Sequence, residues 1–194
     1  MTTKTLQQIW DDLKDQGYES DKNSVHSYLP VYENQLEPYR HTALSVLEIG
    51  VFKGDSIRLW KEYFTKATIF GIDCDEKPHG GMADLFPFVK EHIFDDRVGI
   101  HIFNAEDEQQ AKIRFSRIKF DVIIEDAGHH IEQQLNLYNI WKHYLADGGI
   151  YIVEDVQDID NTKDLFLRLD TETTWIVDLR DKKGRYDDVL IVIK

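Results

Sequence analysis

From residue 45 onward, short apolar runs alternate with segments of helical periodicity, and this alternation restricts the possible folds more than any other feature of the sequence. Segments 55–64 and 131–145 carry apolar residues at helical spacing. Short, continuously apolar strands separated by helices are typical of a parallel sheet that is covered on both faces. Five runs of this kind are found, at residues 45–50, 68–72, 98–103, 121–124 and 149–153.

The end of the chain departs from this alternation. Two apolar runs, 174–179 and 188–193, are separated by a turn at 180–185, so they predict an antiparallel hairpin. The predicted fold is therefore α/β, a doubly wound seven-stranded sheet that ends in a C-terminal antiparallel hairpin.

The first 40 residues differ in character from the rest. A short helical face is formed by Leu6, Ile9, Trp10 and Leu13, and Gly17 is a suitable stop. No repeat, low-complexity tract or linker marks a boundary. We expect one domain over residues 1–194, with residues 1–40 as an N-terminal helical cap or lid.

The charge balance restricts the partners. The 194 residues include 36 acidic and 23 basic side chains, for a formal net charge of −13. Such an excess repels phosphate backbones and anionic lipids, which argues against nucleic-acid and membrane partners and leaves a small molecule or a second copy of the chain. Cys74 is the single cysteine, so no internal disulfide or cysteine-based zinc site can form. With no apolar signal segment or spanning stretch, we expect a cytoplasmic protein.

The first predicted strand ends in a glycine turn. Glu48 is followed by Gly50 and Gly54, which let the backbone turn tightly and approach a ligand. The second strand ends at Asp73, whose carboxylate can accept hydrogen bonds from both ribose hydroxyls of an adenosine. Ligands of doubly wound sheets bind beyond these strand ends, although an ordinary strand–turn and a solvated Asp73 would look the same.

Acidic side chains follow the next two strands. Asp126 comes after the fourth strand and Glu154-Asp155 after the fifth, so these carboxylates are expected to converge at one edge. Crowded carboxylates protonate or acquire a cation, and oxygen ligands favour magnesium, calcium or manganese. Surface acids or a helix cap would give the same pattern.

A histidine lies close to these acids in the sequence. His129, three residues after Asp126, is suited to act as a general base. His130 is the rival, with the alternative role of starting the helix at residue 131. Either histidine could equally be structural or solvent-exposed.

From residue 44 to 194 the sequence resembles class I S-adenosylmethionine-dependent methyltransferases. An acid followed by Gly-x-x-x-Gly matches their first motif, Asp73 matches the acid that closes their second strand, and the final hairpin is a hallmark of the family. The resemblance implies a Rossmann-like methyltransferase fold and S-adenosylmethionine as cofactor. Asn104 departs from the aspartate usual at its position. The cofactor contacts so implied are Ser20, Glu48, Gly50, Gly54, Ser56, Asp73, Asn104, Ala105 and Asp126.

The spacing Asp-x-x-His followed by Glu-Asp resembles, more narrowly, the metal-dependent sugar O-methyltransferases of macrolide biosynthesis. Their usual Asp-Asp-Gly-Ser-His appears here as Glu-Asp-Ala-Gly-His over residues 125–129. The resemblance implies that Asp126, Glu154 and Asp155 hold Mg²⁺ or another hard divalent cation, that His129 is the base, and that a sugar or glycan hydroxyl accepts the methyl group. Ser20-Asp21-Lys22, His26 and Tyr28 fit a signature that lies before the methyltransferase core, which serves either as a lid over the methionine end of the cofactor or as a helix cap.

Two alternatives stay open at this point. A catechol-type O-methyltransferase would use the same metal chemistry, and a silent module would bind the cofactor or a sugar without turnover. Aromatic residues could line a sugar or catechol pocket or simply pack in the core, with core packing favoured for Trp60; they are Tyr28, Tyr32, Tyr39 and Trp60. Acceptor contacts are expected from residues 1–40 and the poorly patterned stretch 77–96.

Overall fold

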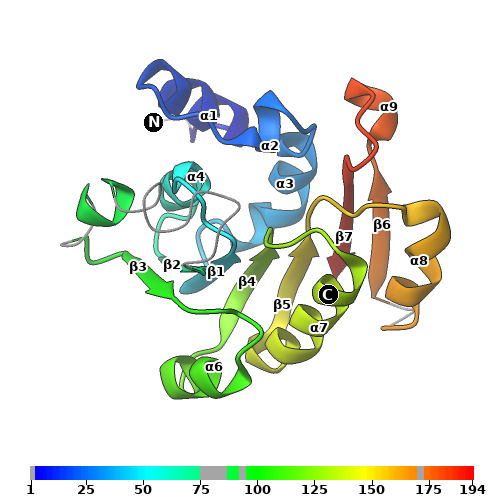
Figure 1. The fold of residues 1–194 in the computed structure, drawn as a ribbon. Coiled ribbons are helices and arrows are strands. Elements are labelled where there is room, and N and C mark those ends of the chain that lie inside the picture. Colours follow the sequence, from blue (N-terminus) through cyan, green and yellow to red (C-terminus); the bar gives the residue numbers. More distant parts are fainter. Residues whose placement is uncertain (1–2, 75–86, 92–94, 170–172) are drawn as a thin grey trace.

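The computed structural model describes residues 3–74, 87–91, 95–169 and 173–194. Most of the stretch 77–96, from which acceptor contacts are expected, lies outside these residues. A seven-stranded sheet in the order β3-β2-β1-β4-β5-β7-β6 forms the centre of the molecule (Figure 1). Its strands are β1 (Ser45–Ile49), β2 (Thr68–Asp73), β3 (Val98–Ile102), β4 (Phe120–Glu125), β5 (Leu145–Val153), β6 (Thr174–Asp178) and β7 (Val189–Ile193).

The pairing confirms the predicted topology. The first five strands pair in parallel, and β7 pairs antiparallel with both β5 and β6. The connection between β6 and β7 contains one helical turn, α9 (Arg180–Lys183), where the sequence predicted only a turn. The antiparallel hairpin forms as expected around it.

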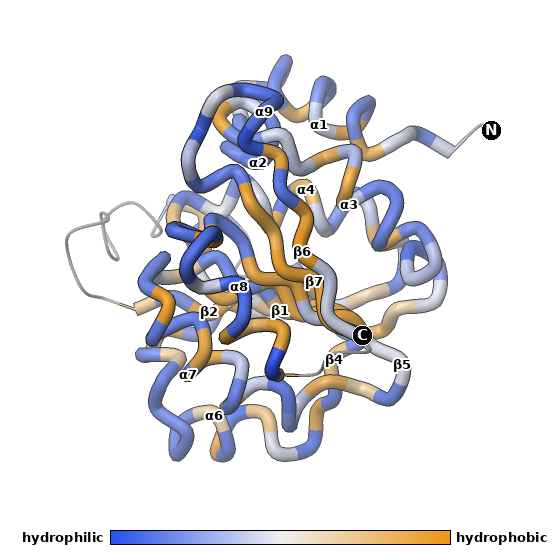
Figure 2. The backbone as a smooth tube through the Cα atoms, turned by 90° about the vertical axis from the view of Figure 1, so that its right-hand side faces the viewer, coloured by the Kyte–Doolittle hydropathy of each residue, from blue (hydrophilic) through white to orange (hydrophobic). Residues whose placement is uncertain are grey.

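Helices cover both faces of the sheet. On one face lie the N-terminal helices and α4; on the other lie α6, α7 and α8 (Figure 1). Alternate residues of each central strand enter the two cores, as Val122 and Ile123 of β4 do, which explains why the strands are continuously apolar. Figure 2 shows hydrophobic residues along the central strands and both hydrophilic and hydrophobic residues along the helices around them. The helices are α1 (Leu6–Asp15), α2 (Asp21–Ser24), α3 (Leu29–Leu36), α4 (Asp55–Tyr63), α6 (Glu108–Phe115), α7 (Ile131–Trp141) and α8 (Ile159–Leu167).

One predicted helix boundary is wrong. The helix predicted over residues 131–145 ends as α7 at Trp141 and continues as a short 3-10 helix, Lys142–Tyr144. Leu145 instead begins β5 and pairs with Phe120 of β4. Leu145 therefore belongs to β5 and not to the helix, because its backbone groups gain partners on β4.

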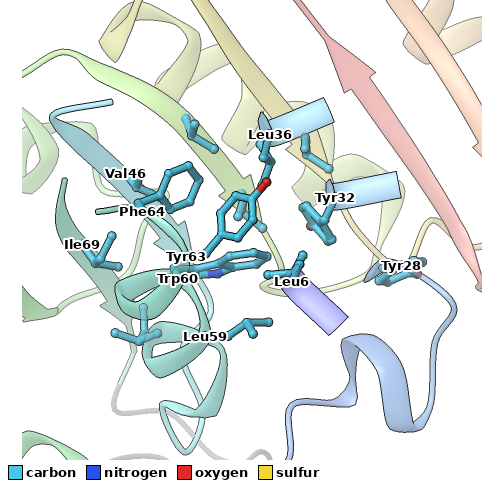
Figure 3. Packing of buried hydrophobic residues seen from close by; sticks show 14 of the residues in the cluster. Leu6, Tyr28, Tyr32, Leu36, Val46, Leu59, Trp60, Tyr63, Phe64 and Ile69 are labelled. Carbon is cyan, nitrogen blue, oxygen red and sulfur yellow. The ribbon is translucent and has the colours of Figure 1, made fainter. Parts of the chain in front are cut away.

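The N-terminal helices share the core of the sheet. Helix α1 begins with a capping box between Thr5 and Gln8, and Gly17, which follows its end, has a φ of 92°. Its apolar face packs against α3 and α4. Figure 3 shows Leu6, Tyr32 and Leu36 beside Trp60 and Tyr63, all of them buried. Trp60 is thus a core residue.

None of the helices in the described part of the chain has the length and apolar character needed to cross a bilayer.

Candidate active site

The glycine turn after β1 lies directly against the loop after β4. Gly50 has a φ of 94°, and a Cβ added there would lie 1.9 Å from the carbonyl oxygen of Asp126. The amide of Asp126 in turn donates to the carbonyl of Ile49 at 2.8 Å. Gly54 has a φ of 83° and precedes α4. Only glycine at position 50 allows the two loops to approach this closely.

Asp73 is bound to the same turn. Its Oδ2 accepts hydrogen bonds from the backbone amides of Val51 and Phe52, both at 2.8 Å. These bonds stabilise a strained conformation, because Phe52 has a φ of 49°. The carboxylate that was expected to meet a ribose shapes the glycine turn through Oδ2, and Oδ1 accepts neither of these bonds.

Glu48 points into the protein interior. Its buried carboxylate accepts hydrogen bonds from Ser56 Oγ at 2.6 Å and from Trp60 Nε1 at 3.2 Å. Helix α4, which carries both donors, is thereby attached to β1. Glu48 and Ser56, both expected at the cofactor, contact each other here.

The loop after β3 is held by local bonds. Asn104 Oδ1 accepts from the amide of Glu106 at 3.0 Å, an Asx turn. The carbonyl of Ala105 accepts from Trp141 Nε1 of α7 at 3.0 Å. Both residues thus lie in the loop between β3 and α6, close to α7.

The predicted acids follow β4 and β5 at one edge of the sheet. Glu125 pairs with Val153 in the sheet, so the residues that follow each strand lie at one edge. Asp155 adopts a φ of 54°, a conformation that few non-glycine residues take. Because β5 has ended at Val153, the strand alternation no longer dictates where Glu154 and Asp155 point.

Among the residues that the structure describes, potential ligand atoms fall into two groups that share Asp126 and separate Glu154 from Asp155. The first group is Asp126, His129 and Asp155, and the second is Glu48, Asp126 and Glu154; within each group the atoms lie within 4.8 Å of one another. His129 Nε2 is 3.6 Å from Asp126 Oδ1 and 3.6 Å from Asp155 Oδ2. His130 instead occupies the N-cap position of α7 and is exposed.

Lys22 lies among the second group of acids. Its fully buried ammonium group is 2.7 Å from Asp126 Oδ2, 2.7 Å from Glu154 Oε1 and 3.2 Å from Glu48 Oε1. Burial alone would lower the pKa of Lys22, but the three carboxylates raise it well above its usual value, so the side chain is charged. Lys22 belongs to the signature that was expected to form a lid or a helix cap, and its pairing with the acids was not predicted. A second signal for this pairing was a set of acids predicted to converge with no cation among them.

Two tyrosines from the N-terminal helices complete this cluster. Tyr28 Oη donates to Asp155 Oδ1 at 2.6 Å, and the hydroxyl of Tyr32 donates to Glu154 Oε1. Both tyrosines are fully buried, so they bind the acids rather than line an open pocket. Tyr39 lies farther away and donates to the carbonyl of Gly148 at 2.8 Å.

His26 and Ser20 support the same region. His26 stacks on Tyr28 with ring centroids 4.7 Å apart, and its Nε2 is 3.4 Å from Asp155 Oδ1. Ser20 caps α2, and its Oγ accepts from the amide of Lys22 at 3.4 Å. Ser20 therefore acts as a helix cap in this structure.

Asp126, His129 and Asp155 shift one another's pKa values. Burial alone would raise the pKa of Asp126, but Lys22 and His129 hold it below its usual value. Burial and the charge of Asp126 raise the pKa of Asp155 to about 6. Burial opposes protonation of His129, yet Asp126 and Asp155 raise its pKa to about 9. Without a metal ion on Asp126 and Asp155, the imidazole of His129 therefore holds a proton at neutral pH.

Glu125 lies behind this site. Its side chain is fully buried, and burial raises its pKa to about 8. It is therefore largely uncharged at neutral pH and adds little to the negative charge of the acidic cluster.

The curated proteins that are similar to this chain include two O-methyltransferases from Streptomyces species. A 146-residue alignment with the 8-demethyl-8-alpha-L-rhamnosyl tetracenomycin-C 2'-O-methyltransferase of Streptomyces olivaceus is 30% identical and covers 71% of this chain and 35% of that protein. A 153-residue alignment with the L-olivosyl-oleandolide 3-O-methyltransferase of Streptomyces antibioticus is 29% identical, with the same two coverages. The chain thus spans about a third of the length of these relatives.

A solved structure shares the fold. The MycE methyltransferase from the mycinamycin biosynthetic pathway, in complex with Mg and SAH, superposes with a TM-score of 0.70 at 17% identity, covering 100% of this chain and 55% of that one. At this identity the likeness shows the Rossmann-like fold alone. Residues 47–156 match the family model described as a methyltransferase domain, which is more than half of the chain. The chain therefore belongs to the methyltransferase domain family.

Proposed function

We propose that this protein transfers a methyl group from S-adenosylmethionine to a sugar hydroxyl, assisted by a divalent cation and by His129. The observation that carries the proposal is the meeting of Asp126, His129 and Asp155 at the carboxyl edge of the sheet, against the glycine turn. The relatives named as O-methyltransferases of rhamnosyl and olivosyl compounds support the acceptor class. The MycE complex supports the pairing of the fold with Mg and SAH.

The cofactor would lie over the glycine turn. Gly50 and Gly54 keep the backbone clear of side chains, and Asp73 offers its carboxylate to the ribose hydroxyls. We propose the remaining predicted contacts, Ser20, Glu48, Ser56, Asn104, Ala105 and Asp126, as the surroundings of this cofactor. S-adenosylmethionine supplies a methyl group on a sulfonium centre, so the task of the protein is to align that methyl with the attacking oxygen and to exclude water.

The acids fit a hard divalent cation. Asp126, Glu154 and Asp155 are oxygen donors of the kind that Mg²⁺ and Mn²⁺ prefer. Lys22 and Tyr32 both contact Oε1 of Glu154, and Tyr28 contacts Oδ1 of Asp155, so each acid has a second oxygen outside these bonds. A divalent cation bound here would polarise two neighbouring hydroxyl oxygens of the acceptor.

His129 would take the proton from the attacking hydroxyl. Its side chain is 33% exposed, so it can reach a bound acceptor. The carboxylates of Asp126 and Asp155 hold its pKa at about 9, and an imidazole that is to act as a base must first lose that proton. If the carboxylates of Asp126 and Asp155 bound a divalent cation, they would no longer stabilise the protonated imidazole. The pKa of His129 would then fall toward the neutral range.

A transfer assay with labelled S-adenosylmethionine tests the proposal. We expect labelled product from rhamnose-like sugars or nucleotide sugars, loss of product with a chelator, and recovery when Mg²⁺ is restored. Product from catechols alone would favour catechol-type methylation. Binding of S-adenosylhomocysteine with no product from any acceptor would favour the silent binding module.

Substitution of Asp73 separates its two roles. Asp73→Ala removes the acceptor of the turn and the ribose carboxylate together, so we expect S-adenosylhomocysteine to bind about 10- to 100-fold more weakly. Asp73→Asn keeps an acceptor oxygen for the amides of Val51 and Phe52 and should lose less affinity. Isothermal titration of both variants is the measurement. Equal binding by Asp73→Ala and the wild type would remove Asp73 from the cofactor site.

The remaining expectations concern partners, location and organisation. The net charge of −13 supports a small-molecule acceptor in preference to nucleic acid or a membrane. The single domain with residues 1–40 as its cap, the cytoplasmic location and a homo-oligomeric state stay predictions.

A further inference from the structure

Lys22 is a fully buried lysine that reaches three acids from three neighbouring strands. Glu48 belongs to β1, Asp126 follows β4, and Glu154 follows β5. The ammonium group has three N–H donors, and it lies within 3.2 Å of an oxygen of each acid. A buried ion of this kind is tolerated only when it is paired, so Lys22 and the acids depend on one another.

The segment that carries Lys22 is itself held in place. Ser20 caps α2, and the carbonyl of Ser20 accepts a hydrogen bond from Trp10 Nε1 of α1 at 3.1 Å. Lys183 of α9 donates to the carbonyl of His26 at 2.6 Å from the other side. Lys22 therefore projects from a backbone that is attached both to α1 and to the C-terminal hairpin.

Lys22 and Tyr28 each contact one of the two carboxylate oxygens of an acid and leave the other oxygen to face His129. Lys22 contacts Oδ2 of Asp126, whereas Oδ1 lies 3.6 Å from His129. Tyr28 donates to Oδ1 of Asp155, whereas Oδ2 lies 3.6 Å from His129. One oxygen of each acid is held from the N-terminal side, and the other is directed toward the imidazole.

We propose that Lys22 is a positioning residue, whose ammonium group supplies the counter-charge that holds Glu48, Asp126 and Glu154 side by side and turns the free oxygen of Asp126 toward the reaction site. The link to catalysis rests on the function proposed above; the charge pairing does not. Residues 20–32 are then a permanent part of the site, and the acids are positioned only when this segment packs against them.

A double-mutant cycle tests the pairing without reference to activity. Lys22→Met removes the charge at similar length and leaves buried acids unpaired, so we expect a lower Tm. In a Glu154→Gln background the same substitution should lower the Tm by at most half as much, because a carboxylate that needed the ammonium is gone. Additive losses of Tm would overturn the proposal.

A buried cation elsewhere in residues 1–40 provides the control. Arg40 lies near Glu33 and Glu37 and is also buried, with 5% of its surface exposed. Arg40→Met should lower the Tm by the same amount with and without Glu154→Gln. Should Lys22→Met not fold, recovery of folding in Lys22→Met/Glu154→Gln supports the pairing. Failure of both, with Arg40→Met folded, overturns it.

Mn²⁺ binding links the pairing to the site. Folded Lys22→Met should bind Mn²⁺ at least tenfold more weakly than the wild type, because Oδ2 of Asp126 is then no longer held by the ammonium group and Oδ1 is no longer directed toward the site, whereas Arg40→Met should bind it normally. Equal Mn²⁺ affinity of Lys22→Met and the wild type would overturn the positioning role. A wild type that binds no Mn²⁺ would contradict the proposed function instead, and the double-mutant cycle would still decide the pairing.

Discussion

Replacing His129 with alanine is expected to lower methyl transfer by about 10²- to 10⁴-fold, the range that general-base catalysis usually contributes. The partly exposed imidazole of His129 lies 3.6 Å from an oxygen of each of Asp126 and Asp155. The glycine turn and Asp73 are untouched by the change, so S-adenosylhomocysteine should bind with nearly wild-type affinity. Initial rates with labelled cofactor, together with isothermal titration, measure both effects.

The neighbouring histidine is the matched control. His130 is exposed and makes no side-chain capping bond to α7. His130→Ala should therefore keep the wild-type rate. Normal methylation by His129→Ala would exclude it as the base, and a comparable loss in His130→Ala would show that the loop rather than the imidazole matters.

Substitution of Asp126 is expected to have the second large effect. Asp126→Asn keeps the shape of the side chain but removes the charge that both groups of acids share. We expect at least about a hundredfold loss of kcat, since polarisation of the acceptor by a divalent cation is worth several kcal/mol. Stability should fall as well, because Lys22 loses one of its closest partners.

The dependence of the rate on Mg²⁺ distinguishes this effect from general damage. Asp126→Asn should show no recovery when Mg²⁺ is added after chelation, whereas the wild type should recover. Asp147→Asn makes the same change of charge at an exposed position near the start of β5 and should behave as the wild type. A full Mg²⁺ response in Asp126→Asn would remove Asp126 from the metal site.

The fold follows from local patterns that are visible in the sequence. Continuous apolar runs become strands whose alternate residues enter opposite cores, as Val122 and Ile123 do. The helix boundary at Trp141 was missed because pairing of Leu145 with Phe120 is a tertiary effect that no local periodicity encodes. The strand ends predicted that acids would gather at one edge, since that edge is a property of parallel topology.

Which side chains and backbone amides contact each acid of the site could not be predicted from local patterns. Lys22 precedes Asp126 by 104 residues and Glu154 by 132, so no spacing rule joins them. The left-handed backbone at Asp155 and the two amides bound by Asp73 depend on loop shapes, which residue types alone do not specify. The signature around Lys22 marked the segment without its partners, and charge balance was a second clue, because acids that meet in the interior require a cation from somewhere in the chain.

The position of Lys22 in the chain also limits which segments can be exchanged to build a working chimera. The region that matches the family, residues 47–156, contains all the acids of the cluster but neither Lys22 nor the two tyrosines that bind them. A chimera that joins this region to a foreign leader would inherit the anions without their counterion. For this chain, the segment to be exchanged as one piece therefore begins upstream of the first strand, at the cap of α2.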